Sequence, residues 1–169
     1  MIIETIKEKT NAVGVLTGYS LMQYCITKKF PEPFLKELGL SDHFHRGLSR
    51  KVLRIPYLDA KGVEQATRYR VAANGDNRFR WQKGNKPFLY GLWRLKPGIS
   101  SIFLVEGESD CHTLWFHNYD ALGLPGADSW NEDRDAPHFK DIAKIFVVDE
   151  EDQGSDTLKK RLSRSSITP

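Results

Sequence analysis

The sequence predicts an α/β protein: a parallel sheet with helices on both faces, preceded by a small basic β-rich module and an N-terminal helical segment. IFLVEG (102–107) and IFVVDE (145–150) are continuous apolar runs, as expected of strands that are buried on both faces. Helix-like stretches alternate with these runs, which favours a parallel sheet. Before them, 51–97 contains short strands separated by turns. The chain has 169 residues, enough for one domain or two small ones.

The N-terminal segment, 1–50, is expected to be helical. A polar helix or loop comes first, and a second helix follows before residue 30. PEPFLKELGL (31–40) then combines a proline near a helix start with Gly39 as a stop signal. We assign no chemistry to this segment.

Residues 51–97 are expected to form the basic β-rich module. KVLRIPYLD (51–59) and VEQATRYRVA (63–72) flank a short turn and predict a hairpin. RFRW (78–81) adds a short strand, and KPFLYGLWRL (86–95) closes the module.

Residues 98–169 are expected to form the parallel-sheet domain, because the hydrophobic period changes after residue 101. The expected strands are 102–107, the start of 120–128 and 145–150, and the expected helices lie within 109–119, 135–144 and 154–165. In sheets of this kind, sites lie at the carboxyl ends of the strands.

Charge is distributed unevenly along the chain. Residues 46–94 hold twelve Lys and Arg against three acids, and 101–156 hold three Lys and Arg against fourteen acids. A basic part followed by an acidic part is compatible with a polyanion track beside a metal site. Two solvated faces of opposite sign would produce the same counts.

The basic module carries candidate nucleic-acid or nucleotide contacts. They are Arg68, Arg70, Arg80, Lys83 and Lys86, with the aromatic residues Tyr69, Phe79, Trp81 and Tyr90 between or beside them. Basic side chains neutralise phosphates and aromatic rings stack on bases, which is the chemistry of single-strand binding. In the alternative, the rings belong to the core and the arginines keep one sheet face hydrated.

Acidic residues follow two of the predicted strands. Glu106 and Asp110 come after the first, and four consecutive acids, Asp149 to Asp152, follow the last. Carboxylates that converge on one rim suit Mg²⁺ or Mn²⁺, and a divalent ion would relieve their repulsion. Alternatively, 149–152 is a solvated loop before a helix N-terminus that prefers acids.

Residues 102–165 resemble a Toprim domain, the metal-binding fold shared by bacterial-type (DnaG-like) primases, topoisomerases and some nucleases. The matching features are Glu106 and Gly107 after a buried strand, Asp110 four residues beyond the glutamate, and the glycine loop in ALGLPGA (121–127).

The second acidic motif of the Toprim pattern is an acid-x-acid pair at a strand end. Glu150 and Asp152 fit this pair best, with Glu in place of the commoner Asp, and Asp149 with Glu151 is the alternative register.

The resemblance implies a catalytic role for Glu106, Asp110, Glu150 and Asp152. Glu106, Glu150 and Asp152 would hold Mg²⁺ (or Mn²⁺). Asp110 would join this site or support it from behind. Toprim folds normally continue to one more strand, so the domain is expected to be truncated at its C-terminus.

The order RIPYLDAKG, RYR, RFRW and FLYGL also resembles the module that precedes Toprim in bacterial-type primases, including those of phages and mobile elements. The implied function is primase-like nucleotidyl transfer, with single-stranded DNA, nucleoside triphosphates and a replicative helicase as partners. The alternatives are a Toprim nuclease and a non-catalytic DNA-binding remnant.

Other features restrict the setting of the protein. No run of about 18 apolar residues predicts a membrane span, and the N-terminus does not read as a secretory signal. Cys25 and Cys111 have no zinc spacing and are expected to be buried thiols, in a cytoplasmic protein. Trp115 and Trp130 are expected to be packing residues. His112 is expected to be a core or surface residue rather than a metal ligand.

Overall fold

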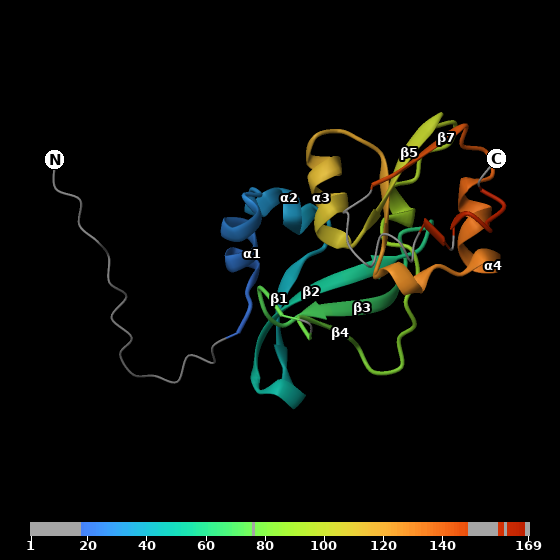
Figure 1. Cartoon of the computed structure of the whole chain (residues 1–169). Helices are drawn as coiled ribbons and strands as arrows, with labels where there is room; N and C mark the ends of the chain where they lie inside the picture. The colour runs from blue at the N-terminus through green and yellow to red at the C-terminus, as the bar shows by residue number, and fades with distance from the viewer. Residues whose placement is uncertain (1–17, 76, 149–158, 161, 168–169) are drawn as a thin grey trace, which may run out of the picture.

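The structure is a computed structural model that describes residues 18–75, 77–148, 159–160 and 162–167. Two sheets of different kinds and a set of short helices make up this part of the chain (Figure 1). Within it, no helix has both the length and the apolar character needed to cross a membrane.

Two short helices open the described chain. The first, α1 (Leu21–Lys28), begins with a capping box in which Ser20 and Gln23 bond to each other's backbone N–H groups. The second, α2 (Glu32–Glu37), follows the N-cap residue Pro31 and has Pro33 in its first turn, where proline is tolerated because no N–H partner is required.

An antiparallel sheet follows, with strand order β1-β2-β3-β4. Its strands are β1 (Ser41–His45), β2 (Arg50–Leu58), β3 (Glu64–Arg70) and β4 (Phe79–Trp81), and a 3-10 turn, η1 (Arg46–Leu48), joins the first two. The predicted strands of 51–81 are confirmed. The N-terminal segment contains the helices α1 and α2 as expected, but it also contains β1, which was not predicted and pairs with β2.

The parallel sheet has the order β6-β5-β7. Its central strand is β5 (Ser101–Glu106), flanked by β6 (Ala121–Leu124) and β7 (Lys144–Val147). The helices between these strands are α3 (Glu108–Phe116), α4 (Glu132–Asp135) and the 3-10 turns η3 (Ala127–Ser129) and η4 (Ala136–Phe139), and a further turn, η2 (Leu92–Arg94), precedes β5.

Side chains alternate along β5, so each face of the parallel sheet contributes to a different core. Val105 packs with Cys111 and Trp115 of α3, whereas Leu104 packs with Phe139 of η4 on the other face. The prediction of a parallel sheet with helices on both faces is therefore confirmed.

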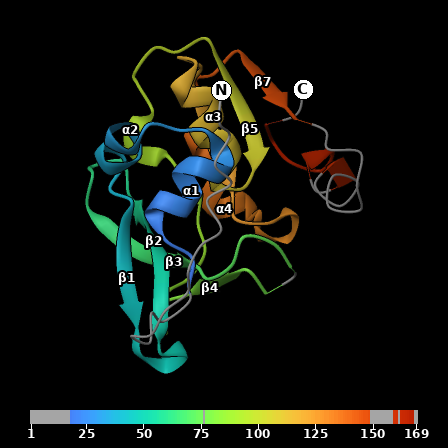
Figure 2. The same ribbon diagram turned by 90° about the vertical axis from the view of Figure 1, so that its left-hand side faces the viewer.

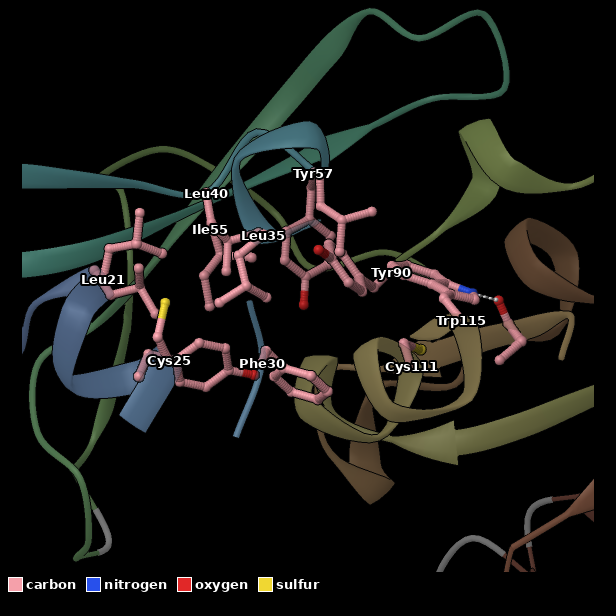
Figure 3. Packing of buried hydrophobic residues seen from close by; sticks show 14 of the residues in the cluster. Leu21, Cys25, Phe30, Leu35, Leu40, Ile55, Tyr57, Tyr90, Cys111 and Trp115 are labelled. Atoms are coloured by element: carbon pink, nitrogen blue, oxygen red, sulfur yellow. Dashed lines mark hydrogen bonds between the residues drawn. The ribbon is translucent and has the colours of Figure 1, made fainter. Parts of the chain in front are cut away.

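The core on the α3 side continues across to the antiparallel sheet. Figure 3 shows Leu35 of α2, Ile55 and Tyr57 of β2, Tyr90 and Trp115 in one continuous cluster. Because the two sheets share this core, the antiparallel module and α3 have one defined relative position. Figure 1 shows α3 between α2 and β5, and in Figure 2 α1 lies toward the viewer, beside the antiparallel strands.

Candidate active site

A cleft of about 650 Å³ lies where the antiparallel module meets the carboxyl end of β5. Its acidic wall includes Glu106 and Asp110, and its basic wall includes Arg68, Arg70 and Arg78. The structure therefore brings two of the predicted acids, Glu106 and Asp110, and two of the predicted basic contacts, Arg68 and Arg70, into the lining of one hollow.

The acidic wall is built by the turn from β5 into α3. Glu106 is the last residue of β5, and Asp110 lies in the first turn of α3. Gly107 connects them with a φ of 93°, a conformation that glycine adopts without the steric cost of a side chain. The N-terminal end of α3 carries a partial positive charge, which favours carboxylates at this position.

Close packing holds this turn against β6. A side chain added at Gly123 would place its Cβ 2.8 Å from the Cys111 sulfur and 3.0 Å from the carbonyl oxygen of Gly107. The backbone N–H of Gly107 also donates to Leu124 at 2.7 Å. The position of Glu106 and Asp110 is thus set by backbone contacts that only glycine at 123 permits.

The third strand of the sheet ends at the same edge as Glu106. Leu104 of β5 pairs with Val147 of β7, and the N–H of Val148 donates to the Leu104 carbonyl at 3.1 Å. Glu150 and Asp152, the predicted second acidic pair, lie outside the described residues. In the described ranges, no three acidic, histidine or cysteine side chains are grouped as a metal site.

Glu108 was not identified from the sequence, yet it is the central acid of the contact between the two modules. Its side chain is 2% exposed. Oε1 accepts hydrogen bonds from the Tyr57 hydroxyl at 2.6 Å and from Arg68 Nη1 at 2.9 Å. Its other oxygen, Oε2, is buried and has no hydrogen-bond partner in the described part of the chain. Two strands of the antiparallel sheet are thus tied to α3 by one carboxylate.

Burial raises the pKa of Tyr57 well above its usual value, and the neighbouring Glu108 charge raises it further. Burial alone would lower the pKa of Arg68, but Glu108 and Tyr57 outweigh this effect and raise it. Tyr57 therefore stays a neutral donor and Arg68 stays charged, as the shared carboxylate requires.

Three guanidinium groups surround the ring of Phe79 on the basic wall. The Cζ atoms of Arg68, Arg70 and Arg78 lie 4.3, 5.3 and 5.5 Å from the ring centroid. Arg70 is itself 6% exposed and donates to the backbone carbonyls of Ala72 and Ala73. The Phe79 ring packs against the core, as the alternative of core aromatic residues predicts, and it lines the cleft together with the three arginines.

The five predicted nucleic-acid contacts do not share one surface. In antiparallel sheets directly opposed residues point to the same face, and Arg80 pairs with Tyr69, whereas Arg70 pairs with Phe79. Arg80 is therefore on the opposite face from Arg68 and Arg70. Exposed Lys83 and Lys86 follow β4 and are likewise not part of the cleft wall.

The cleft gains a basic residue from the N-terminal segment instead. Lys28, the last residue of α1, lines the cleft together with Arg78. Both side chains are exposed. This placement was not predicted from residues 1–50, because it depends on how α1 packs against α3 and could not be read from local sequence.

His112 joins three separate parts of the chain beneath the site. It is fully buried on α3, and its two ring nitrogens bond to the hydroxyl groups of Tyr24 at 2.8 Å and Tyr90 at 2.9 Å. Burial lowers its pKa to about 3, and the positive charges of Arg94 and Arg70 act in the same direction. A neutral imidazole can donate one bond and accept the other. The expected core role is confirmed, and so is packing by Trp115 and Trp130.

The chain is similar to several known proteins. No protein-family model matches the chain. The Gene 57 protein of Mycobacterium phage D29 is 31% identical over 97 residues, which cover 55% of this chain and 60% of that protein.

Solved primase structures match over most of the chain. The DnaG primase catalytic domain bound to single-stranded DNA superposes with a TM-score of 0.66 at 14% identity, covering 83% of this chain and 57% of that one. The primase fragment of the bacteriophage T7 primase-helicase protein superposes with a TM-score of 0.65 at 16% identity, covering 95% and 71%. A complex of the bacteriophage T7 lagging-strand DNA polymerase with primase domains of two gp4 subunits, bound to an RNA/DNA hybrid and dTTP, gives a TM-score of 0.63 at 19% identity, covering 82% and 70%.

The chain therefore has the fold of the primase catalytic core, and the predicted resemblance is confirmed at the level of the fold. It spans 60% of the phage relative and 57% of the DnaG catalytic domain.

Proposed function

We propose that the protein acts in DNA replication of a phage or mobile element as a primase-like nucleotidyltransferase on a single-stranded DNA template. The observation that carries this proposal is the cleft, which sets the carboxylates of β5 and α3 against the arginines of the antiparallel sheet. Nucleotidyl transfer needs both, since the incoming triphosphate is anionic and its reacting phosphate must be held beside the acids.

Glu106 and Asp110 fit a divalent ion by their chemistry, since hard carboxylate oxygens at a strand end suit Mg²⁺ or Mn²⁺. Glu106 would be a direct ligand with Glu150 and Asp152, and Asp110 would join or support them. A bound Mg²⁺ would supply charge neutralisation and polarisation of a phosphoryl group.

The protein's own residues would orient the reactants. The guanidinium groups around Phe79 make the basic wall attractive to polyphosphate, because their charges add within a hollow that excludes part of the solvent. Arg80, Lys83 and Lys86 lie outside that wall and would contact the phosphates of the template strand. One neighbour with this fold is bound to single-stranded DNA, which supports the DNA partner.

A replicative helicase is the partner that this function would require to supply unwound template. One of the matched structures is a fragment of a primase-helicase protein, which supports the proposal.

Primer synthesis by the purified chain tests the function. We would incubate it with single-stranded DNA, labelled ribonucleoside triphosphates and Mg²⁺ or Mn²⁺, with Glu106→Gln as the matched control. We expect short, template-dependent RNA that the variant does not make. Shortened DNA without RNA would instead identify a nuclease, and DNA binding with neither product would identify a binding remnant.

A further inference from the structure

The basic residues of the cleft wall differ in whether their side chains are already bound by groups within the protein. We propose that Lys28 and Arg78 form the subsite that binds the phosphate chain of a nucleotide, and that Arg68 and Arg70 build this wall without binding the phosphates themselves. The inference deepens the proposed function and rests on it for the identity of the ligand as a nucleotide.

Arg68 is already committed to an internal partner. Its Nη1 lies 2.9 Å from Glu108, and its side chain is 12% exposed. The guanidinium also lies 4.3 Å from the Phe79 centroid and 5.3 Å from that of Trp81. A phosphate would have to compete with a buried carboxylate for this charge, and separating a buried ion pair is costly.

Arg70 is held by the backbone rather than by an acid. Its Nε donates to Ala72 and its Nη2 to Ala73, at 3.3 and 2.9 Å. Its guanidinium also lies 5.0 Å from the Tyr19 ring and 5.3 Å from the Tyr24 ring. Arg70 therefore adds a positive charge to the wall, but most of its surface is covered.

Lys28 and Arg78 differ from both arginines. Each is exposed, each lines the cleft, and they approach it from α1 and from the start of β4. Among the ion pairs of the described residues, neither Lys28 nor Arg78 has a carboxylate partner. Their charges are available to a ligand, and the uncompensated charge of Arg70 beside Arg78 increases the local attraction for an anion.

The opposite wall explains why a polyphosphate fits better than a single strand of nucleic acid. Glu106 and Asp110 face the same hollow and would repel a bare phosphodiester chain. A triphosphate that carries a divalent cation can bridge the two walls, with phosphate oxygens at Lys28 and Arg78 and the cation toward the acids. The volume of about 650 Å³ is in the range of small-molecule sites, about 300–1,000 Å³.

The chain offers two residues of the same type as controls. Lys29 follows Lys28 and is exposed, but it is not part of the cleft wall. Arg46 of η1 is exposed as well, does not line the cleft and is not among the proposed nucleic-acid contacts. Glutamine at any of these positions removes one charge and keeps a polar stem, so the four variants change the net charge equally.

The test measures binding of inorganic tripolyphosphate by calorimetry at low salt, with and without Mg²⁺, in the full chain and in Lys28→Gln, Lys29→Gln, Arg78→Gln and Arg46→Gln. We expect Lys28→Gln and Arg78→Gln each to weaken binding by about five- to tenfold, as loss of a charge-assisted hydrogen bond predicts. Lys29→Gln and Arg46→Gln should stay within about twofold, the effect of net charge alone.

Equal losses of tripolyphosphate affinity in all four variants would contradict the proposed subsite, because they would show unspecific attraction by net charge. No measurable tripolyphosphate binding by the unchanged protein would overturn it as well. Binding of a labelled single-stranded oligonucleotide is measured in parallel. If DNA binding and primer synthesis persist while the subsite fails, the proposed function stands and only the placement of the phosphates is wrong.

Discussion

Replacing Glu108 should destabilise the protein more than any exposed acid, because the two sheets meet at its carboxylate. In Glu108→Ala, the Tyr57 hydroxyl and the Arg68 guanidinium both lose their acceptor, and their side chains stay buried. Breaking a buried ion pair by removing one partner costs about 3–5 kcal/mol. For a chain of this size about 1 kcal/mol corresponds to roughly 2–4 °C in Tm. We therefore expect Tm to fall by about 6–20 °C.

The assay is equilibrium unfolding in denaturant, followed by far-UV circular dichroism, with thermal melts in parallel. Glu108→Gln keeps an acceptor for Tyr57 but removes the charge opposite Arg68, so its free energy of unfolding should fall by a smaller amount, about 1–3 kcal/mol. Glu32→Ala is the surface control, since the Glu32–Lys36 pair joins exposed side chains one helical turn apart. Such pairs contribute about 0.3–0.5 kcal/mol.

A double variant, Glu108→Leu with Arg68→Met, checks the cause. It removes both charges together and leaves apolar side chains that can pack, so it should be less destabilised than the sum of the two single changes. The reasoning would be refuted if Glu108→Ala lowered the free energy of unfolding by less than about 1 kcal/mol. It would also be refuted if the double variant lost the sum of the free energies lost in the two single variants.

Three further outcomes follow from the structure. His112 has a pKa of about 3 when folded and near 6.5 when unfolded. The unfolded chain therefore binds the extra proton first, and stability falls by about 1.4 kcal/mol per pH unit as the pH drops from about 6 toward 3. In His112→Gln this slope should be reduced, which unfolding curves across that pH range measure; an unchanged slope would contradict the assignment. Gly123→Ala should destabilise by about 1–3 kcal/mol through overlap with Cys111 and Gly107. Gly47→Ala should not, because a Cβ at Gly47 would make only ordinary van der Waals contact with the His45 ring, at 3.4 Å; comparable melting temperatures of the two variants would count against this packing. Arg80→Ala should weaken binding of single-stranded DNA modestly and lower its salt dependence, as determined by anisotropy titrations at several salt concentrations, and salt-independent binding would exclude a phosphate contact.

The metal prediction needs a separate measurement, because two of the three predicted ligands, Glu150 and Asp152, lie outside the described residues. Titration calorimetry with Mn²⁺ on the unchanged protein and on Glu106→Gln compares the two directly. We expect weak binding that the variant loses, as is usual for Mg²⁺-type sites that keep several waters. Equal binding by both proteins would place the ion elsewhere.

The local sequence was sufficient to predict the elements that depend on interactions between residues close together in the chain. The apolar run of 102–105 had to be a buried strand, and Glu106, Gly107 and Asp110 had to follow it at a strand end, because a strand-turn-helix junction depends on neighbours in the chain. Parallel pairing then brings the ends of β5 and β7 to one edge, which alternation of strands and helices already indicated.

Only the tertiary structure decided which charges are available at that edge. Arg68 and Arg70 look equivalent to Arg80 in sequence, yet burial, the Glu108 pair and strand register give the three residues different surroundings. Lys28 enters the cleft from a segment about eighty residues before Asp110, and Glu108 is buried by strands about forty to fifty residues away. Burial and electrostatic partners depend on contacts between distant segments, and hydrophobic periodicity carries no information about which segments meet.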